Sequence, residues 1–189
     1  MKLLVLDNYD SFTYNLVHML RALGVTELEV HRNDRISVAE VDSYSHIVLS
    51  PGPGLPSEAG IMPEVVKTYA KSKNILGVCL GHQCIGEVFG ATLQNLANPV
   101  HGKGIVSKVL DKEDLLFKGL PQEFITGRYH SWVVEKDKLP TDLIVTAEDP
   151  AGYIMALRHK NYSVYGVQFH PESVLTEYGA ELMKNWIEG

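Results

Sequence analysis

Apolar runs alternate with amphipathic segments through the first half of the chain. Short runs rich in Val, Ile and Leu predict buried strands at 2–7, 28–31, 46–50 and 75–79. The stretches between them have helical periodicity, and the predicted helices are 11–23, a short one near Val38, 63–71 and 81–89. Strands that alternate with helices are typical of a parallel sheet covered by helices on both faces.

The first predicted helix has recognisable boundary signals. Leucines repeat along one face of the segment 11–23, as they do in a helix that packs against a sheet. Asp10 or Ser11 is expected to cap its N-terminus, and Gly24 is expected to end it.

The second half of the chain has short apolar segments separated by turn residues. The predicted strands there are 105–110, 132–135, 143–147, 153–158 and 163–169, and a final helix covers 177–186. Consecutive strands without intervening helices favour antiparallel pairing. We therefore predict an α/β fold with a doubly wound, mostly parallel central sheet flanked by helices and with additional antiparallel strands in the C-terminal half. No repeat or linker divides the sequence, so residues 1–189 are expected to form a single domain.

Cys79 follows the apolar strand that begins at Ile75 and precedes a predicted helix. Gly77 and Gly81 flank it two positions away on each side, where side chains would collide if the backbone bent sharply enough to expose the sulfur. The positive end of the helix favours a thiolate, which is the attacking form of cysteine. A cysteine in an apolar run is, taken alone, more often a packing residue. The two glycines favour a nucleophile instead.

A candidate base lies near the C-terminus, where an apolar run ends at His170 and a carboxylate follows at Glu172. If the strand continues, these two residues point to the same side, and Glu172 orients the imidazole that receives the cysteine proton. Pro171 stiffens the spacing between them. A histidine at a strand end has an ordinary structural explanation, so the hypothesis depends on the combination with Cys79.

The segment Ser50-Pro-Gly-Pro-Gly54 breaks an apolar strand into a turn. Taken alone it is an ordinary loop. Because prolines have no N–H, only Gly52 and Gly54 have free backbone donors there. The Leu80 N–H, directly after Cys79, is the natural second donor to an oxyanion. The candidate nucleophile, the candidate base and the backbone N–H donors follow three separate predicted strands. Their combination favours an enzyme that catalyses acyl transfer.

These motifs resemble those of the class I, or triad-type, glutamine amidotransferases, which share Gly-x-Cys-x-Gly at the nucleophile and His-Pro-Glu near the C-terminus. The resemblance extends to the glutaminase subunits of anthranilate synthase and aminodeoxychorismate synthase through Asp7-Asn-Tyr-Asp-Ser-Phe-Thr-Tyr-Asn15 and Arg128-Tyr-His-Ser131. It covers essentially the whole chain. It implies that Cys79 attacks the carboxamide of glutamine, that ammonia leaves, and that water releases glutamate.

The resemblance also implies roles for individual residues. Cys79, His170 and Glu172 would form the catalytic triad, and Gly52 and Leu80 the oxyanion hole. The residues expected to bind glutamine are Gly52, Pro53, Gly54, Gln83, Ser131 and Trp132. The family usually has a smaller aliphatic residue where Trp132 stands, which puts the shape of that pocket wall in question. Activity is still expected because the implied contact is made by the backbone.

A chorismate-binding synthase subunit is the partner that the resemblance implies. Ammonia is lost to water unless an acceptor enzyme is docked, so the chain alone is expected to be a weak glutaminase. Anthranilate synthesis is the favoured pathway, with aminodeoxychorismate synthesis, or service to both, as the alternative. The segment 7–15 either faces the synthase subunit or only caps a helix and supplies core aromatics. Two further hypotheses are a partner-independent γ-glutamyl hydrolase and a non-catalytic interaction module, although the latter would normally have lost the triad.

Composition narrows the functional classes. A formal charge of −6 without clustered Lys and Arg argues against nucleic-acid binding. The chain has eight histidines, but His82, His101 and His130 lie in unrelated segments without metal-ligand spacing, so neither a metal nor another cofactor is expected. No apolar run approaches the roughly 20 residues that span a bilayer, and the N-terminus lacks a signal-peptide profile, which favours a cytoplasmic location. Cys84 is expected to be a packing residue.

Overall fold

The computed structural model describes all 189 residues and contains one nine-stranded sheet in the order β2-β1-β3-β4-β9-β8-β7-β5-β6. Five strands are parallel to one another: β1 (Leu3–Asp7), β2 (Leu28–Arg32), β3 (His46–Leu49), β4 (Asn74–Val78) and β9 (Val164–Val167). The other four are antiparallel to their neighbours: β5 (Leu93–Val109), β6 (Glu123–Val134), β7 (Leu143–Glu148) and β8 (Ile154–His159). The predicted fold class is confirmed.

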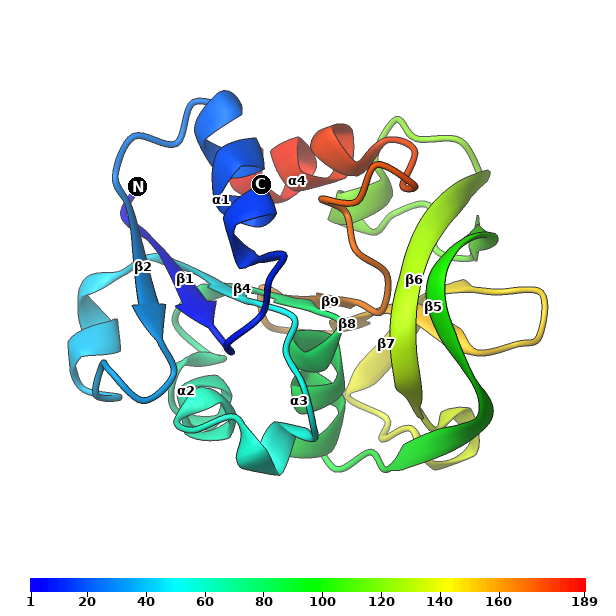
Figure 1. Cartoon of the computed structure of the whole chain (residues 1–189), viewed down its shortest axis with the longest axis horizontal. Helices are drawn as coiled ribbons and strands as arrows, with labels where there is room; N and C mark the ends of the chain where they lie inside the picture. The colour runs from blue at the N-terminus through cyan, green and yellow to red at the C-terminus, as the bar shows by residue number, and fades with distance from the viewer.

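Helices cover both faces of the parallel strands (Figure 1). The four helices are α1 (Thr13–Ala22), α2 (Met62–Tyr69), α3 (Leu80–Val88) and α4 (Gly179–Glu188). The helices α1 and α4 lie on one side of the sheet, and α2 and α3 lie on the other. Short 3-10 turns lie at Glu40–Ser43, Pro56–Glu58, Leu115–Phe117 and Lys136–Lys138. The first of these replaces the short helix that the sequence predicts near Val38.

Two apolar clusters fill the space between the sheet and the helices, because side chains of each buried strand alternate between its faces. In β1, Leu4 and Leu6 point to the α2 and α3 side, whereas Leu3 and Val5 point to the other side, and all four are fully buried. Burial of each such side chain stabilises the fold by roughly 1.5–3 kcal/mol. These clusters make the parallel half of the sheet a rigid support.

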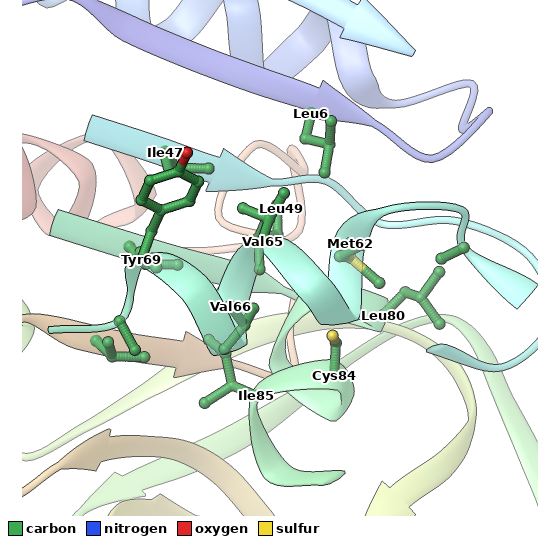
Figure 2. Packing of buried hydrophobic residues seen from close by; sticks show 14 of the residues in the cluster. Leu6, Ile47, Leu49, Met62, Val65, Val66, Tyr69, Leu80, Cys84 and Ile85 are labelled. Atoms are coloured by element: carbon green, nitrogen blue, oxygen red, sulfur yellow. The ribbon is translucent and has the colours of Figure 1, made fainter. Parts of the chain in front are cut away.

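Cys84 belongs to the cluster beneath α2 and α3, as Figure 2 shows. Its side chain is fully buried near Met62, Val66 and Ile85. Burial raises the pKa of its thiol to about 12. The prediction that Cys84 is a packing residue is therefore confirmed.

The helix α1 begins at Thr13, two residues later than predicted, and its N-cap residue Phe12 makes no side-chain cap. Asp10 instead accepts a hydrogen bond from the Phe12 N–H (2.7 Å) within the preceding turn. The Thr13 hydroxyl donates to Asp7 (2.9 Å). The predicted end is correct, because Gly24 adopts a φ of +91° that glycine tolerates best.

The strands β5 and β6 are much longer than the predicted segments 105–110 and 132–135. They form a bent antiparallel ribbon with register shifts between Asn95 and Val100 and between His101 and Lys103 (Figure 1). These irregularities interrupt the alternation of apolar and polar residues, and one side of the ribbon faces solvent. The remaining predicted helices and strands are present with boundaries shifted by a few residues. No helix is both long and apolar enough to span a membrane.

Candidate active site

Cys79 lies in the sharp turn between β4 and α3, with φ of 52° and ψ of −97°. This left-handed backbone is rare for a residue with a side chain and costs about 1–3 kcal/mol. The turn is held by hydrogen bonds from the Cys79 N–H to the Val167 carbonyl (2.9 Å) and from the Gln83 N–H to the Cys79 carbonyl (3.1 Å). The residue stands at the carboxyl edge of the parallel strands, where open α/β sheets bind ligands.

The glycines on each side of Cys79 are required by close packing. A Cβ at Gly77 would overlap the carbonyl group of Gly81. A Cβ at Gly81 would lie 2.5 Å from the carbonyl oxygen of Leu49 on β3. The predicted reason for this glycine pair is thus confirmed. Cys79 is the N-cap residue of α3, so the first N–H groups of that helix, which have no partner within it, lie at the same end as the cysteine.

His170 and Glu172 form a hydrogen bond in which Nδ1 donates to Oε1 at 2.7 Å. Both residues are buried, with exposed fractions of 2% and 8%. The predicted strand geometry is wrong, because β9 ends at Val167 and the pair lies in a turn closed by the Ser173 N–H and the His170 carbonyl (3.2 Å). Pro171 cannot donate to a sheet ladder, and the turn brings the two side chains together instead of strand alternation.

The His170 backbone is fixed on both sides. Its N–H donates to the Gly127 carbonyl (3.0 Å), and its carbonyl accepts from the Thr176 hydroxyl (2.6 Å). The Gly127 N–H donates to the same threonine oxygen (2.9 Å). This arrangement anchors the turn to β6, so the imidazole is positioned by the rigid sheet.

Burial disfavours a charged His170, but its interaction with the nearby Cys79 and its hydrogen bond with Glu172 outweigh burial and raise its pKa. Its Nε2 has no partner of conventional hydrogen-bond geometry, which leaves that nitrogen available to the cysteine sulfur. A raised histidine pKa beside a thiol favours transfer of the thiol proton to the imidazole. The arrangement can therefore supply an activated sulfur and hold its proton.

Aromatic rings enclose the imidazole. The Tyr129 ring centroid lies 4.9 Å and the Phe12 ring centroid 5.7 Å from that of His170, and both rings meet it at steep angles. Neither residue has a site role predicted from the sequence, although both lie within the motifs that carry the family resemblance. Within the segment 7–15, Tyr9 and Tyr14 have exposed fractions of 48% and 59%. That segment thus combines a site wall with outward-facing aromatic side chains.

The loop with Gly52 is pressed against the end of β1. A Cβ at Gly52 would lie 2.6 Å from the Asn8 carbonyl oxygen and 3.0 Å from a methyl carbon of Leu80. The two residues predicted as oxyanion donors are therefore neighbours. Asn8 is buried and binds Ser50 at the start of this loop, and Asn33 donates to the Asn8 side chain (3.0 Å). Sequence reasoning missed this support, because an asparagine after a strand also fits an ordinary turn.

A pocket of about 260 Å³ opens beside Cys79. All six residues predicted to bind glutamine border it, and its complete lining is Gly52, Pro53, Gly54, Cys79, Gln83, Tyr129, His130, Ser131 and Trp132. His170, Glu172 and Leu80 lie outside this lining. Larger hollows of about 530, 390 and 320 Å³ exist elsewhere, but none of the three is bordered by the cysteine. The smaller pocket is the one that combines a nucleophile with room for a small polar molecule.

Two histidines near the site are held neutral by burial, which lowers the pKa of His82 to about 3 and that of His130 to about 4. The His130 Nδ1 donates to the Trp132 carbonyl (3.1 Å). No three His, Cys, Asp or Glu side chains gather in an arrangement that could hold a metal ion.

Comparisons with known proteins identify the family of the chain. The sequence matches the family model described as glutamine amidotransferase class-I over residues 4–188. The aminodeoxychorismate/anthranilate synthase component 2 of Bacillus subtilis is 45% identical over 188 residues, covering 98% of this chain and 95% of that protein. The anthranilate synthase component 2 of Azospirillum brasilense is 47% identical over 188 residues, covering 98% of this chain and 94% of that protein.

The similarity also extends to a longer protein and to solved structures. The bifunctional protein TrpGD of Thermotoga maritima is 46% identical over 98% of this chain, which spans 32% of that protein's length. A structure from Thermoplasma acidophilum, provisionally described as part of a GMP synthase, superposes with a TM-score of 0.89 and 30% identity, covering 100% of this chain and 92% of the other. On the family model and these near full-length relatives, the chain belongs to the class I glutamine amidotransferase family.

Proposed function

We propose that this chain is the glutaminase subunit of anthranilate synthase and that Cys79, His170 and Glu172 form its catalytic triad. The observation that carries the proposal is the buried 2.7 Å hydrogen bond between His170 and Glu172 beside a cysteine held in a left-handed turn. The pocket that this cysteine borders supports glutamine as the substrate, since all six expected binding residues line it.

In the proposed reaction, His170 takes the Cys79 proton and the sulfur attacks the carboxamide carbon of glutamine. The N–H groups of Gly52 and Leu80 stabilise the tetrahedral oxyanion. The carbon–nitrogen bond then breaks as His170 returns the proton to the leaving nitrogen, and ammonia departs. Water attacks the resulting thioester with His170 as base, and glutamate leaves as the thiol reforms. Glu172 holds the imidazole tautomer throughout, and the chemistry requires no cofactor in this chain.

Glutamine binding is assigned to the pocket wall. The backbone of Ser131 and Trp132 and the side chain of Gln83 are proposed to hold the amino-acid end of the substrate, and the loop from Gly52 to Gly54 to enclose its carboxamide. The Gln83 Nε2 already donates to the Trp132 carbonyl (2.9 Å), which leaves its carbonyl oxygen as the acceptor available to a substrate ammonium group.

The proposed partner is a chorismate-binding synthase subunit that accepts the ammonia. The names of the Bacillus subtilis and Azospirillum brasilense relatives as component 2 proteins support a second component. Neither nucleic acid nor a membrane is part of the proposal. The two free cysteines, Cys79 and Cys84, fit a reducing compartment, and we propose a cytoplasmic location.

Anthranilate is the proposed product of the complex, because the Azospirillum brasilense relative is named for that synthase alone. The alternative is aminodeoxychorismate synthesis or service to both pathways, which the dual name of the Bacillus subtilis relative favours. Reconstitution of the chain with each synthase subunit would distinguish these pathways by the aromatic product.

A direct test of the triad compares nitrogen sources in the reconstituted complex. Cys79→Ala should abolish glutamine-dependent synthesis and leave ammonia-dependent synthesis intact, because only nitrogen delivery is lost. Cys84→Ala is the matched control and should retain glutamine-dependent synthesis. Loss of both activities in the Cys79 variant would contradict the assignment.

A further inference from the structure

A fully buried glutamine side chain contacts the sulfur of the proposed nucleophile. Gln168 has no exposed surface, and its Nε2 lies 3.6 Å from the Cys79 Sγ within hydrogen-bonding range for sulfur. It follows β9 and precedes His170 by two residues. Besides the His170 imidazole, the sulfur lies near the Tyr129 carbonyl oxygen (3.9 Å), which can accept a hydrogen bond but cannot donate one.

The orientation of the Gln168 amide is fixed by a chain of two hydrogen bonds. The Trp132 carbonyl can only accept, so Gln83 must direct its NH₂ group toward it (2.9 Å). The same Nε2 donates to the Gln168 Oε1 (3.2 Å). The Gln168 Nε2 therefore faces the sulfur, because its carbonyl oxygen is already engaged. This relay runs from a backbone carbonyl of β6 through α3 to Cys79.

We infer that Gln168 is a further catalytic residue, which donates an N–H hydrogen bond to the Cys79 sulfur and stabilises its thiolate form. The inference rests on the proposed role of Cys79 as nucleophile. A neutral thiol can donate its own proton to the Tyr129 carbonyl, whereas a buried thiolate needs donors. Hydrogen bonds to an ionised acceptor are about twice as strong as those between neutral groups. The Gln168 N–H therefore favours the thiolate over the thiol.

A purely structural role makes a different prediction. The bond between Gln83 and Gln168 joins α3 to the segment after β9, and that role needs only the Gln168 carbonyl oxygen. Loss of such a brace would loosen the site and change the reactivity of Cys79 to a similar extent at every pH. Loss of a donor to the thiolate lowers reactivity only at those pH values where thiol and thiolate compete.

The test is the rate at which iodoacetamide alkylates the full-length chain, with peptide mass spectrometry to separate Cys79 from Cys84. Gln168→Met keeps the approximate length of the side chain and removes the donor. It should slow alkylation of Cys79 about 10-fold near pH 6 and less than about 2-fold near pH 9, a pH at which an ordinary cysteine thiol is already mostly ionised. The ultraviolet absorbance of the thiolate should fall in parallel near pH 6. Gln94→Met, an exposed position on β5, is the matched control and should leave both rates unchanged.

Two further variants test the same inference if Gln168→Met does not fold. Gln168→Leu lacks the donor but differs in shape, and it should give the same pH dependence. Gln83→Met removes the residue that orients the Gln168 amide, and it should produce a smaller loss of Cys79 alkylation in the same direction. Unchanged alkylation, or an equal loss at both pH values, would overturn the inference. Wild-type labelling at Cys84 instead of Cys79 would overturn the proposed nucleophile itself, so the two failures are distinguishable.

Discussion

The backbone N–H of Asn8 donates to the Ser50 hydroxyl, and the Asn8 side-chain amide donates to the Ser50 carbonyl, both at 2.8 Å. These two bonds join the carboxyl end of β1 to that of β3. They hold the loop in which Gly52 rests against the Asn8 backbone. The proposed oxyanion donors are therefore supported by the parallel half of the sheet.

Gly52→Ala is expected to displace this loop, because its Cβ would lie 2.6 Å from the Asn8 carbonyl oxygen. Loss of one oxyanion donor should lower kcat of glutamine hydrolysis by about 100- to 1000-fold. Gly119→Ala is the matched control, since nothing lies within 4 Å of its Cβ position. That control should affect thermal stability more than kcat, and an equal loss of kcat in both variants would argue against the assigned role.

An electrophilic analogue of glutamine is expected to label Cys79 and not Cys84. Cys84 is fully buried, and burial raises its thiol pKa to about 12, so its thiolate is scarce at neutral pH. Mass spectrometry of the labelled peptides provides the measurement. Modification of Cys84 in the folded protein would mean that the nucleophile is wrongly assigned.

His170→Ala is expected to impair glutamine hydrolysis more than Glu172→Ala. The histidine carries the proton in both halves of the reaction, whereas the carboxylate orients the imidazole through the 2.7 Å bond. The kcat of Glu172→Ala should be about 10- to 100-fold higher than that of His170→Ala. Steady-state glutamate release measures both. The reverse order would contradict the division of roles.

Stability is expected to fall in mild acid because His82 is buried in its neutral form with its pKa lowered to about 3. Below about pH 6.5 the unfolded chain binds a proton that the folded chain excludes, so unfolding becomes easier as pH falls toward 3. Between about pH 6.5 and 5 this one group should cost about 2 kcal/mol of unfolding free energy.

Denaturant unfolding of His82→Met across this pH range measures the effect. The variant should show a weaker dependence on pH, although not a flat one, because His130 acts in the same direction. His18→Gln, which removes an exposed histidine, is the matched control. An unchanged slope in the His82 variant would show that another group controls acid stability.

Trp132→Leu is expected to retain activity, with KM for glutamine changed less than about 10-fold. The residue contributes its carbonyl to Gln83 at 2.9 Å, and that backbone contact does not depend on the side chain. The half-buried indole borders the pocket, so its loss should alter the shape of the pocket wall and leave the catalytic groups in place. Measurement of kcat and KM would separate these effects, and a collapse of kcat would assign the indole a direct role.

The nucleophile turn and the parallel half of the sheet were predictable because their causes are local. Gly77 and Gly81 are needed where the backbone packs too closely for a Cβ, and uninterrupted apolar runs mark strands buried on both faces. Apolar periodicity could not reveal the ribbon of β5 and β6, since its bulges shift the alternation and one side is exposed. The pairing of His170 with Glu172 was predicted for the wrong geometric reason.

The supports of the site could not be predicted because they join residues far apart in the sequence. Asn8 is joined to Ser50 by two hydrogen bonds, and Gln168 makes one hydrogen bond with Gln83 and one with Cys79. No local sequence pattern encodes these contacts. Phe12 and Tyr129 likewise meet at His170 although they lie far apart in the sequence. Their positions within the family motifs could have indicated a role at the site, but a motif does not specify which side chains are in contact.

The most direct test is glutamate release from glutamine by the purified chain, alone and with each candidate synthase subunit plus chorismate, with identification of the aromatic product. We predict weak turnover by the chain alone. When the anthranilate synthase subunit is added, turnover should become strong and anthranilate should form. Strong turnover indifferent to both subunits would contradict the proposal and favour an independent γ-glutamyl hydrolase.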